Sequence, residues 1–252
     1  MEKSNIHEKI KLLTGNGMWH TQETEDLPSV HLSDGPHGLR KQEEKERQNN
    51  VSLVSTCYPT ASALACSWDV TAAERLGRAV AKEAWNADVA VLLGPGINMK
   101  RSPLCGRNFE YFSEDPFLAG RLGAAYVSAA QGEDVAVSLK HFAANNQETN
   151  RQTANSQIDE RALREIYLSA FEYVVKTARP ATIMASYNRL NGYYACENRH
   201  LLTEILREEW GFDGVVISDW GACADLAKAV KAGMDLETVS YTHLTLPTIL
   251  LV

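Results

Sequence analysis

The stretch that decides the fold class is Gly214-Val215-Val216-Ile217-Ser218-Asp219-Trp220. It begins with glycine, continues through three β-branched residues, and ends with a carboxylate and an indole. A short β-branched run of this kind predicts a strand that is buried on both faces. An acid at the tip of such a strand does not serve packing, and the strand tips of α/β barrels form the active-site face. The alternative is that Asp219 only caps the next helix.

Outward from this stretch, buried strands alternate with helices along the chain. The further predicted strands span 27–33, 89–93, 135–139 and 181–186. The predicted helices span 71–86, 115–131, 159–175, 201–210 and 222–232, with Thr71 and Glu74 as a capping box and Asp159 as an N-cap. Strict alternation predicts a parallel sheet with right-handed crossovers. We therefore predict an α/β fold, a (β/α)8 TIM-like barrel, over the alternative of an open doubly wound sheet.

Composition excludes several classes of function. The 252 residues are 44% hydrophobic and carry a net charge of −7, which argues against nucleic acid and anionic membranes as partners. The polar start Met1-Glu2-Lys3-Ser4-Asn5 does not resemble a secretory signal, so we expect a cytoplasmic protein. The cysteines are odd in number and lack CxxC spacing, which indicates reduced thiols and no zinc site. We expect neither a cofactor nor a metal.

The predicted strand ends gather polar and aromatic residues: Asp34, Arg40, Arg107, Lys140, His141, Tyr187, Asp219 and Trp220. On one face of a barrel, the cations would keep Asp219 ionised and would donate charge-assisted hydrogen bonds to hydroxyl groups. An indole beside a carboxylate offers an apolar surface to a pyranose. The pattern thus favours sugar chemistry.

Each of these residues also has a structural interpretation. Arg107 could be part of a surface ion-pair group with Glu110, Glu114 and Asp115. The Lys140 amine could extend to solvent, His141 could be hydrogen-bonded in the core, and Tyr187 could be a core residue. Their expected convergence on one face favours the functional interpretation.

Five motifs in order carry a family resemblance. They are Leu32-Ser33-Asp34-Gly35-Pro36-His37-Gly38-Leu39-Arg40, the run from Leu104 to Pro116 (LCGRNFEYFSEDP), Leu139-Lys140-His141-Phe142-Ala143-Ala144-Asn145-Asn146, Ser186-Tyr187-Asn188 and Val216-Ile217-Ser218-Asp219-Trp220. From about Leu12 to Glu237 the chain resembles the N-terminal barrel domain of glycoside hydrolase family 3, close to its bacterial β-glucosidases.

The resemblance implies a role for each residue. Asp219 looks like the catalytic nucleophile. The implied ligands of the terminal sugar and residues of its pocket are Asp34, Arg40, Arg107, Lys140, His141, Met184, Tyr187 and Trp220. The implied function is that of a retaining, exo-acting β-glycosidase, most simply a β-glucosidase that acts on β-linked gluco-oligosaccharides or on aryl and alkyl β-glucosides.

The general acid/base is expected to lie outside this chain. In the β-glucosidase branch it is a Glu from a second α/β domain downstream, and that domain is absent from the 252 residues. The Asp/His pair that the family's N-acetylglucosaminidases use after the Lys-His strand is not matched here, because the loop reads Asn145-Asn146-Gln147-Glu148. We therefore expect the fragment to be inactive on unactivated glycosides.

The resemblance ends abruptly after Glu237. Residues 238–252 fit a translated sequencing-adapter sequence, so we predict a native barrel domain at 1–237, incomplete at its C-terminal end, and a tail that is not native. The alternative is a genuine apolar C-terminal strand. A barrel that lacks its last elements is expected to leave an unpaired parallel edge and exposed apolar surface.

Two functions from other classes remain as alternatives. The first is a non-catalytic sugar-binding remnant. The second is a Schiff-base lyase that uses Lys140 at a strand end. A metal-dependent hydrolase is disfavoured, because the seven histidines form no HxH or HExxH motif.

Overall fold

A parallel sheet of five strands, in the order β10-β7-β5-β4-β3, forms the centre of the computed structural model, which describes residues 6–42 and 51–238. The strands of this sheet are β3 (Leu32–Asp34), β4 (Val91–Leu93), β5 (Ala136–Phe142), β7 (Thr182–Ala185) and β10 (Val215–Ser218). Two small sheets accompany it: one of two strands, β1 (Gly15–Asn16) and β2 (His20–Thr21), and one of three, β6 (Asn155–Ser156), β8 (Arg189–Leu190) and β9 (Tyr193–Tyr194).

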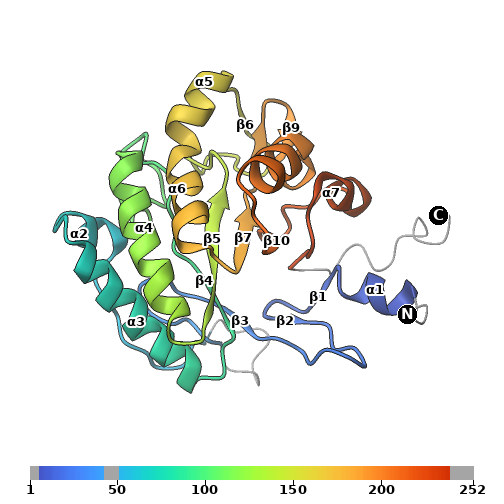
Figure 1. Ribbon diagram of the computed structural model, residues 1–252, viewed down its shortest axis with the longest axis horizontal. Helices are drawn as coiled ribbons and strands as arrows, with labels where there is room; N and C mark the ends of the chain where they lie inside the picture. Colours follow the sequence, from blue (N-terminus) through green and yellow to red (C-terminus); the bar gives the residue numbers. More distant parts are fainter. Residues whose placement is uncertain (1–5, 43–50, 239–252) are drawn as a thin grey trace.

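Helices alternate with the strands of the sheet, and the first and last of them lie before β3 and after β10. They are α1 (Ile6–Lys11), α2 (Ala61–Ala65), α3 (Val70–Asn86), α4 (Pro116–Gln131), α5 (Glu160–Ala162), α6 (Ser169–Ala178) and α7 (Leu226–Ala232). Two π-helical segments span Leu163–Tyr167 and His200–Glu209, and a 3-10 turn spans Ala195–Glu197. Helices α3, α4 and α6 lie side by side along one face of the sheet (Figure 1). This is the parallel α/β arrangement that the sequence predicts.

The two faces of the sheet bury different residues, because successive side chains of a strand point in opposite directions. Leu92, Ile183 and Val216 belong to the main core with the helices. Their neighbours point the other way and form a small interior cluster: Leu32, Val91, Leu93, Met184, Ile217 and Leu236. A sheet that is apolar on both faces is typical of a barrel wall.

The predicted fold is a (β/α)8 barrel that is incomplete at its C-terminal end, and the described residues form an open parallel sheet. Their parallel sheet has five strands and does not close on itself. Single bridges link its two edges instead: Leu236 pairs with Ile217, Glu237 pairs with Thr14, and His20 pairs with His31. An antiparallel N-terminal hairpin and the short segment after α7 make these bridges.

β10 is the last strand in the order of the sheet, but its outer side is also hydrogen-bonded, so the expected unpaired edge does not lie on β10. The backbone N–H of Leu236 donates to Val216 O at 3.1 Å, and the N–H of Ser218 donates to Leu236 O at 2.9 Å. Continuing the same path, the N–H of Gly15 donates to Glu237 O at 2.8 Å. The strand that carries Asp219 is therefore hydrogen-bonded on both sides.

The N-caps of two helices test the predictions made from local sequence. The N-cap of α3 is Asp69, whose Oδ1 accepts from Thr71 N at 2.9 Å, so the predicted capping box at Thr71 is wrong and the helix begins earlier. Asp159 is confirmed as an N-cap, since its Oδ1 accepts from Ala162 N at 2.9 Å. The helix after it is not continuous, because a π-helical segment separates α5 from α6.

Within residues 6–42 and 51–238 no helix is long and apolar enough to cross a bilayer. In the same residues no group of His, Cys, Asp and Glu side chains has the geometry of a metal site. All five cysteines are free thiols.

Candidate functional site

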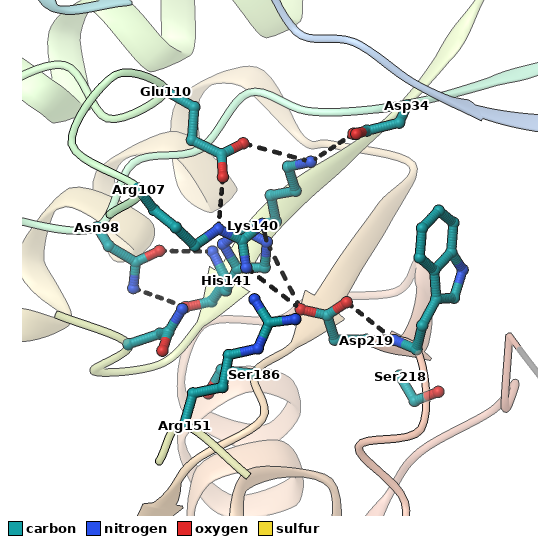
Figure 2. Close-up of polar contacts among 12 residues, drawn as sticks. Asp34, Asn98, Arg107, Glu110, Lys140, His141, Arg151, Ser186, Ser218 and Asp219 are labelled. Carbon is teal, nitrogen blue, oxygen red and sulfur yellow. Dashed lines mark hydrogen bonds and ion pairs between the residues drawn. The ribbon is translucent and has the colours of Figure 1, made fainter. Parts of the chain in front are cut away.

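Asp219 directly follows the C-terminal end of β10, and its side chain lies in a buried cluster of charged residues (Figure 2). Its side chain is 9% exposed. One oxygen, Oδ1, accepts from the backbone N–H of Trp220 at 2.8 Å, whereas Oδ2 has no hydrogen-bond partner. One carboxylate oxygen is thus fixed and the other is available for chemistry.

Lys140 projects from β5 into the same cluster and is almost completely buried. Its Nζ donates to Asp34 Oδ1 at 2.8 Å and lies 3.6 Å from Glu110 Oε2. Burial acts to lower the pKa of Lys140, but the two carboxylates outweigh burial and the pKa is raised. Burial acts to raise the pKa of Asp34, but Lys140 outweighs it and that pKa is lowered. Both groups are therefore charged at neutral pH.

Arg107 connects the remaining members of the cluster. Its Nε donates to Glu110 Oε1 at 2.5 Å, its Nη2 lies 2.7 Å from His141 Nε2, and its Nη1 lies 3.7 Å from Asp219 Oδ2. The guanidinium is thus held on one side by a buried carboxylate while it faces the proposed nucleophile on the other.

His141 is fully buried between these groups. Its Nδ1 lies 3.0 Å from the Tyr111 hydroxyl, and its Nε2 lies 3.7 Å from Asp219 Oδ2. The Asn98 amide binds both backbone groups of His141, with Nδ2 to His141 O at 2.8 Å and His141 N to Oδ1 at 2.7 Å. Burial and the cations Arg107, Lys140 and Arg151 hold the pKa of His141 well below its usual range, so the ring is neutral.

Burial also has the largest effect on the pKa of Asp219. It raises the pKa of this carboxyl above the ordinary aspartate value, and the opposing effects of Arg107, the Trp220 N–H, Lys140 and the Tyr187 hydroxyl do not fully compensate. From the sequence we expected Lys140 and Arg107 to keep this carboxylate ionised. The structure adds the desolvation cost, because the carboxylate lies almost out of reach of water.

Three further predicted residues surround Asp219. Tyr187 is buried, and the guanidinium of Arg151 lies over its ring at 4.3 Å from the centroid. Trp220 is half-buried and makes an edge contact with Trp19, with ring centroids 4.4 Å apart. Met184 belongs to the interior cluster and is in register with Lys140 on the neighbouring strand. The structure therefore brings all three to this end of the sheet.

Arg40 is the predicted residue that does not join the cluster through its side chain. Its backbone N–H donates to Asp34 O at 2.9 Å, which closes the loop after β3. The residue is exposed, and within the described ranges no hydrogen bond or ion pair joins its guanidinium to the other site residues. Arg40 is near the site by chain connection alone.

Four residues of the site were missed as site residues from the sequence: Asn98, Glu110, Tyr111 and Arg151. The sequence treats Glu110 as a surface ion-pair partner, whereas it is 5% exposed and lies between Arg107 and Lys140. The available signal was its i,i+3 spacing from Arg107 in a polar loop. For Asn98 and Tyr111, the roles depend on contacts with a residue about thirty or more positions away, and no local pattern reports such contacts.

The neutral state of His141 predicts how stability depends on pH. The unfolded ring binds a proton below its ordinary pKa of 6.5, whereas the folded ring stays neutral. The contribution of His141 to the free energy of unfolding is therefore complete above pH 6.5. It is lost as pH falls, with a slope of up to ~1.4 kcal/mol per pH unit. We expect urea unfolding to give a lower free energy of unfolding at pH 5.5 than at pH 7.5. In His141→Gln the difference between the two pH values should be smaller.

His200 provides the matched control. Its hydrogen bond with Glu204 raises its pKa, so its contribution has the opposite sign: it is present below pH 6.5 and is lost as pH rises through the raised pKa. This side chain is 46% exposed, so the effect should be small. An acid-side loss that persists in His141→Gln would contradict the assignment to His141.

Comparison with known proteins identifies the class to which this fold and site belong. The model of the glycosyl hydrolase family 3 N terminal domain matches residues 35–245. The chain belongs to this family, as its five motifs indicated.

Its curated relatives are enzymes with named activities. The chain is 52% identical over 241 residues to the thermostable beta-glucosidase B of Acetivibrio thermocellus, and this match covers 94% of the chain and 32% of the relative. It is 50% identical over 243 residues to the exo-alpha-(1->6)-L-arabinopyranosidase of Bifidobacterium longum, with the same two shares. The chain thus spans about a third of the length of these relatives.

Solved structures give the same result for the fold. The beta-glucosidase of Kluyveromyces marxianus in complex with glucose superposes with a TM-score of 0.90 at 43% identity, over 95% of this chain and 28% of that one. The GH3 beta-glucosidase of Bifidobacterium adolescentis superposes with a TM-score of 0.88 at 49% identity, over 93% and 34%. The chain therefore shares its fold with the matching part of these structures.

The predicted boundary at Glu237 remains a prediction. Residues 239–252 lie outside the described part of the chain, so the structure does not bear on the predicted tail. Glu237 and Thr238 are described and buried, next to Gly15 and Ser218 respectively.

Proposed function

We propose that this chain is the nucleophile-bearing part of a retaining, exo-acting β-glycosidase that releases terminal non-reducing β-D-glucose. The observation that carries the proposal is the buried Oδ2 of Asp219, which lacks a hydrogen-bond partner and faces Arg107 and His141 at 3.7 Å. A carboxylate oxygen in this position is available to bond with an anomeric carbon. The names of the relatives support glucose as the sugar.

The mechanism would be a double displacement. Asp219 Oδ2 attacks C1 while the bond from C1 to the leaving oxygen breaks, and a general acid protonates that oxygen. Water then attacks C1 of the covalent intermediate, gives up its proton to the same group acting as base, and releases Asp219. Asp34 and Lys140 would hold the sugar hydroxyls, and their opposite charges provide both an acceptor and donors.

The acid/base would come from residues beyond this chain. A resting general acid must be protonated and about 5–5.5 Å from the nucleophile in a retaining enzyme. Of the carboxylates in the cluster, Asp34 has a lowered pKa and an ion pair with Lys140, and Glu110 is paired with both Arg107 and Lys140. Asp34 is thus not suited to be protonated at rest, and both oxygens of Glu110 face cations, which supports a donor from elsewhere in the protein.

This proposal predicts a large difference between substrates for the 252-residue chain. Dinitrophenolate leaves without protonation, whereas the leaving glucose of cellobiose needs an acid. We expect turnover of cellobiose to be about 10²–10⁴-fold below that of an intact relative, with much of the deficit recovered on a dinitrophenyl glucoside. Cellobiose hydrolysis at the rate of the Acetivibrio thermocellus relative would contradict the missing acid.

The Schiff-base alternative is disfavoured by the charge state of Lys140. An amine nucleophile must lose its proton, and catalytic lysines have lowered pKa values. The pKa of Lys140 is raised by Asp34 and Glu110, the opposite direction.

A second sugar remains a candidate because of one specific relative. The Bifidobacterium longum arabinopyranosidase is nearly as similar as the glucosidase. An α-L-arabinopyranoside has the ring of a β-D-galactoside without its hydroxymethyl group. It therefore differs from a β-D-glucoside in the orientation of O4 and in the missing hydroxymethyl group at C5. Relative rates with the dinitrophenyl glycosides of glucose, xylose, galactose and arabinopyranose would rank the candidates.

The test of the proposed function is covalent trapping. Dinitrophenyl 2-deoxy-2-fluoro-β-D-glucoside should transfer its sugar to Asp219, since the leaving group needs no acid and the fluorine slows hydrolysis of the intermediate. We expect peptide mass mapping to place the label on Asp219 and Asp219→Asn to prevent it. A label on another residue would overturn the assignment. Glucose binding by calorimetry without any label would favour the sugar-binding remnant.

A further inference from the structure

The two ring nitrogens of His141 have partners of different kinds. Nε2 lies 2.7 Å from Nη2 of Arg107. A guanidinium carries donors and no acceptor, so Nε2 must present its lone pair. A neutral imidazole with an unprotonated Nε2 carries its proton on Nδ1, and the group next to Nδ1 is the Tyr111 hydroxyl at 3.0 Å. Tyr111 therefore accepts a hydrogen bond from His141.

The surroundings of Tyr111 support this direction. Asn145 Nδ2 also donates to the Tyr111 hydroxyl, at 3.3 Å. The same amide nitrogen donates to Glu148 Oε1 at 3.0 Å, and Glu148 is fixed by Arg151 at 2.8 Å. A carboxylate only accepts, so the Asn145 amide cannot be reversed. Two donors thus converge on the two lone pairs of one buried hydroxyl.

We propose that Tyr111 is a positioning residue that fixes His141 as its neutral Nδ1–H tautomer, so that Nε2 holds Arg107 and leaves Asp219 Oδ2 free for the sugar. The tautomer stands on the contacts alone, whereas its consequence for the reaction rests on the proposed function. Tyr111 is fully buried and acts through His141.

The alternative protonation states would disable the nucleophile. With a proton on Nε2, His141 would oppose the Arg107 donors and would turn its N–H toward Asp219 Oδ2, which is 3.7 Å away. An imidazolium would in addition form an ion pair with that oxygen. The charged groups that face the ring are Arg107, Lys140, Arg151 and Asp219. The three cations oppose a further positive charge, and Asn98 prevents the backbone from moving away.

Nitrogen NMR of the 252-residue chain reads the tautomer directly, because protonated and unprotonated ring nitrogens resonate far apart. Signals are assigned by their loss in His141→Gln. We expect an unprotonated Nε2 and a protonated Nδ1 in the wild-type protein, and a changed pattern in Tyr111→Phe. Tyr193→Phe, which alters an exposed tyrosine, should leave the pattern unchanged.

The NMR results can contradict the proposal in two ways. A wild-type His141 with protonated Nε2, or with both nitrogens protonated, overturns the proposal, and so does a Tyr111→Phe spectrum identical to wild type. The tautomer of His141 in the wild-type protein can be measured even if the variant does not fold. If Tyr111→Phe does not fold, Asn145→Ala replaces it: the proposal requires this variant, which keeps the Tyr111 hydroxyl, to retain the wild-type tautomer.

The consequence for the reaction has a separate readout. The rate of Asp219 labelling by the fluoro-glucoside should fall ~tenfold in Tyr111→Phe, the effect of one lost hydrogen bond, and the loss should grow toward acid pH. A loss that is equal at every pH would indicate a merely structural role and overturn the positioning role. If wild-type protein is not labelled at all, the proposed function fails while the NMR result still decides the tautomer.

Discussion

Replacing Lys140 by Met is expected to lower the free energy of unfolding by about 3–5 kcal/mol, because it removes one partner from a buried charge cluster. The side chain is 4% exposed and lies between Asp34 and Glu110, of which Glu110 has a side chain that is 6% exposed. Without the ammonium, the buried Glu110 loses one of its two cations, and Asp34, whose side chain is 28% exposed, loses its ion pair. Methionine retains the volume of the lysine stem, so the change isolates the charge.

Urea unfolding of the 252-residue chain measures this effect, and Lys228→Met is the matched control. Lys228 is paired with Asp225 at 3.3 Å, but its side chain is 69% exposed, so its loss should change stability by about 0–1 kcal/mol. Equal effects of the two substitutions would show that the buried cluster does not stabilise the fold.

The pH dependence of the Lys140→Met penalty gives an independent check. In the wild-type protein Asp34 has a lowered pKa, so its pairing contributes stability above the ordinary aspartate range and loses it as pH falls. Without Lys140 the burial effect remains unopposed by its nearest cation, the pKa of Asp34 rises, and the penalty should shrink on acidification. A penalty that is constant from pH 7.5 to pH 4.5 would point to lost packing.

Replacing Asp219 by Gly is expected to reduce hydrolysis of a dinitrophenyl β-glucoside by at least ~10⁴-fold, as loss of a covalent nucleophile does in other enzymes. Azide should restore turnover, because a small anion fits the space that the carboxylate leaves. It attacks C1 from the face opposite the leaving group and forms an α-glucosyl azide. Proton NMR of the product reads the configuration of this bond.

The control for this experiment is Asp213→Gly. Asp213 pairs with Arg179 on the surface, with a side chain that is 76% exposed, and is not part of the site. It should hydrolyse the substrate at the wild-type rate and gain nothing from azide. Rescue of Asp219→Gly that yields a β-azide would exclude attack from the side of Asp219 and with it the retaining mechanism.

Much of the fold could be predicted, because the signals for its strands are local. Three of the five strands of the sheet lie within predicted runs, whereas β3 extends one residue beyond its predicted run, to Asp34, and β5 extends three, to Phe142. Glycine and apolar β-branched residues bound and fill these runs. The sequence did not predict which distant segments pair beside β10. Leu236, Glu237 and Thr14 do so through single bridges that leave no periodic pattern in the sequence.

For the site, the sequence by itself determined which side chains stand at the strand ends, because period-2 alternation and strand termination are local properties. Asp34, Lys140, His141 and Asp219 could be named in this way. Only the tertiary structure decided how these groups are charged and paired. Burial raises the pKa of Asp219 and lowers that of His141, and Glu110 becomes a buried partner of two cations. These properties depend on desolvation and on distances between segments far apart in the chain, which no local pattern encodes.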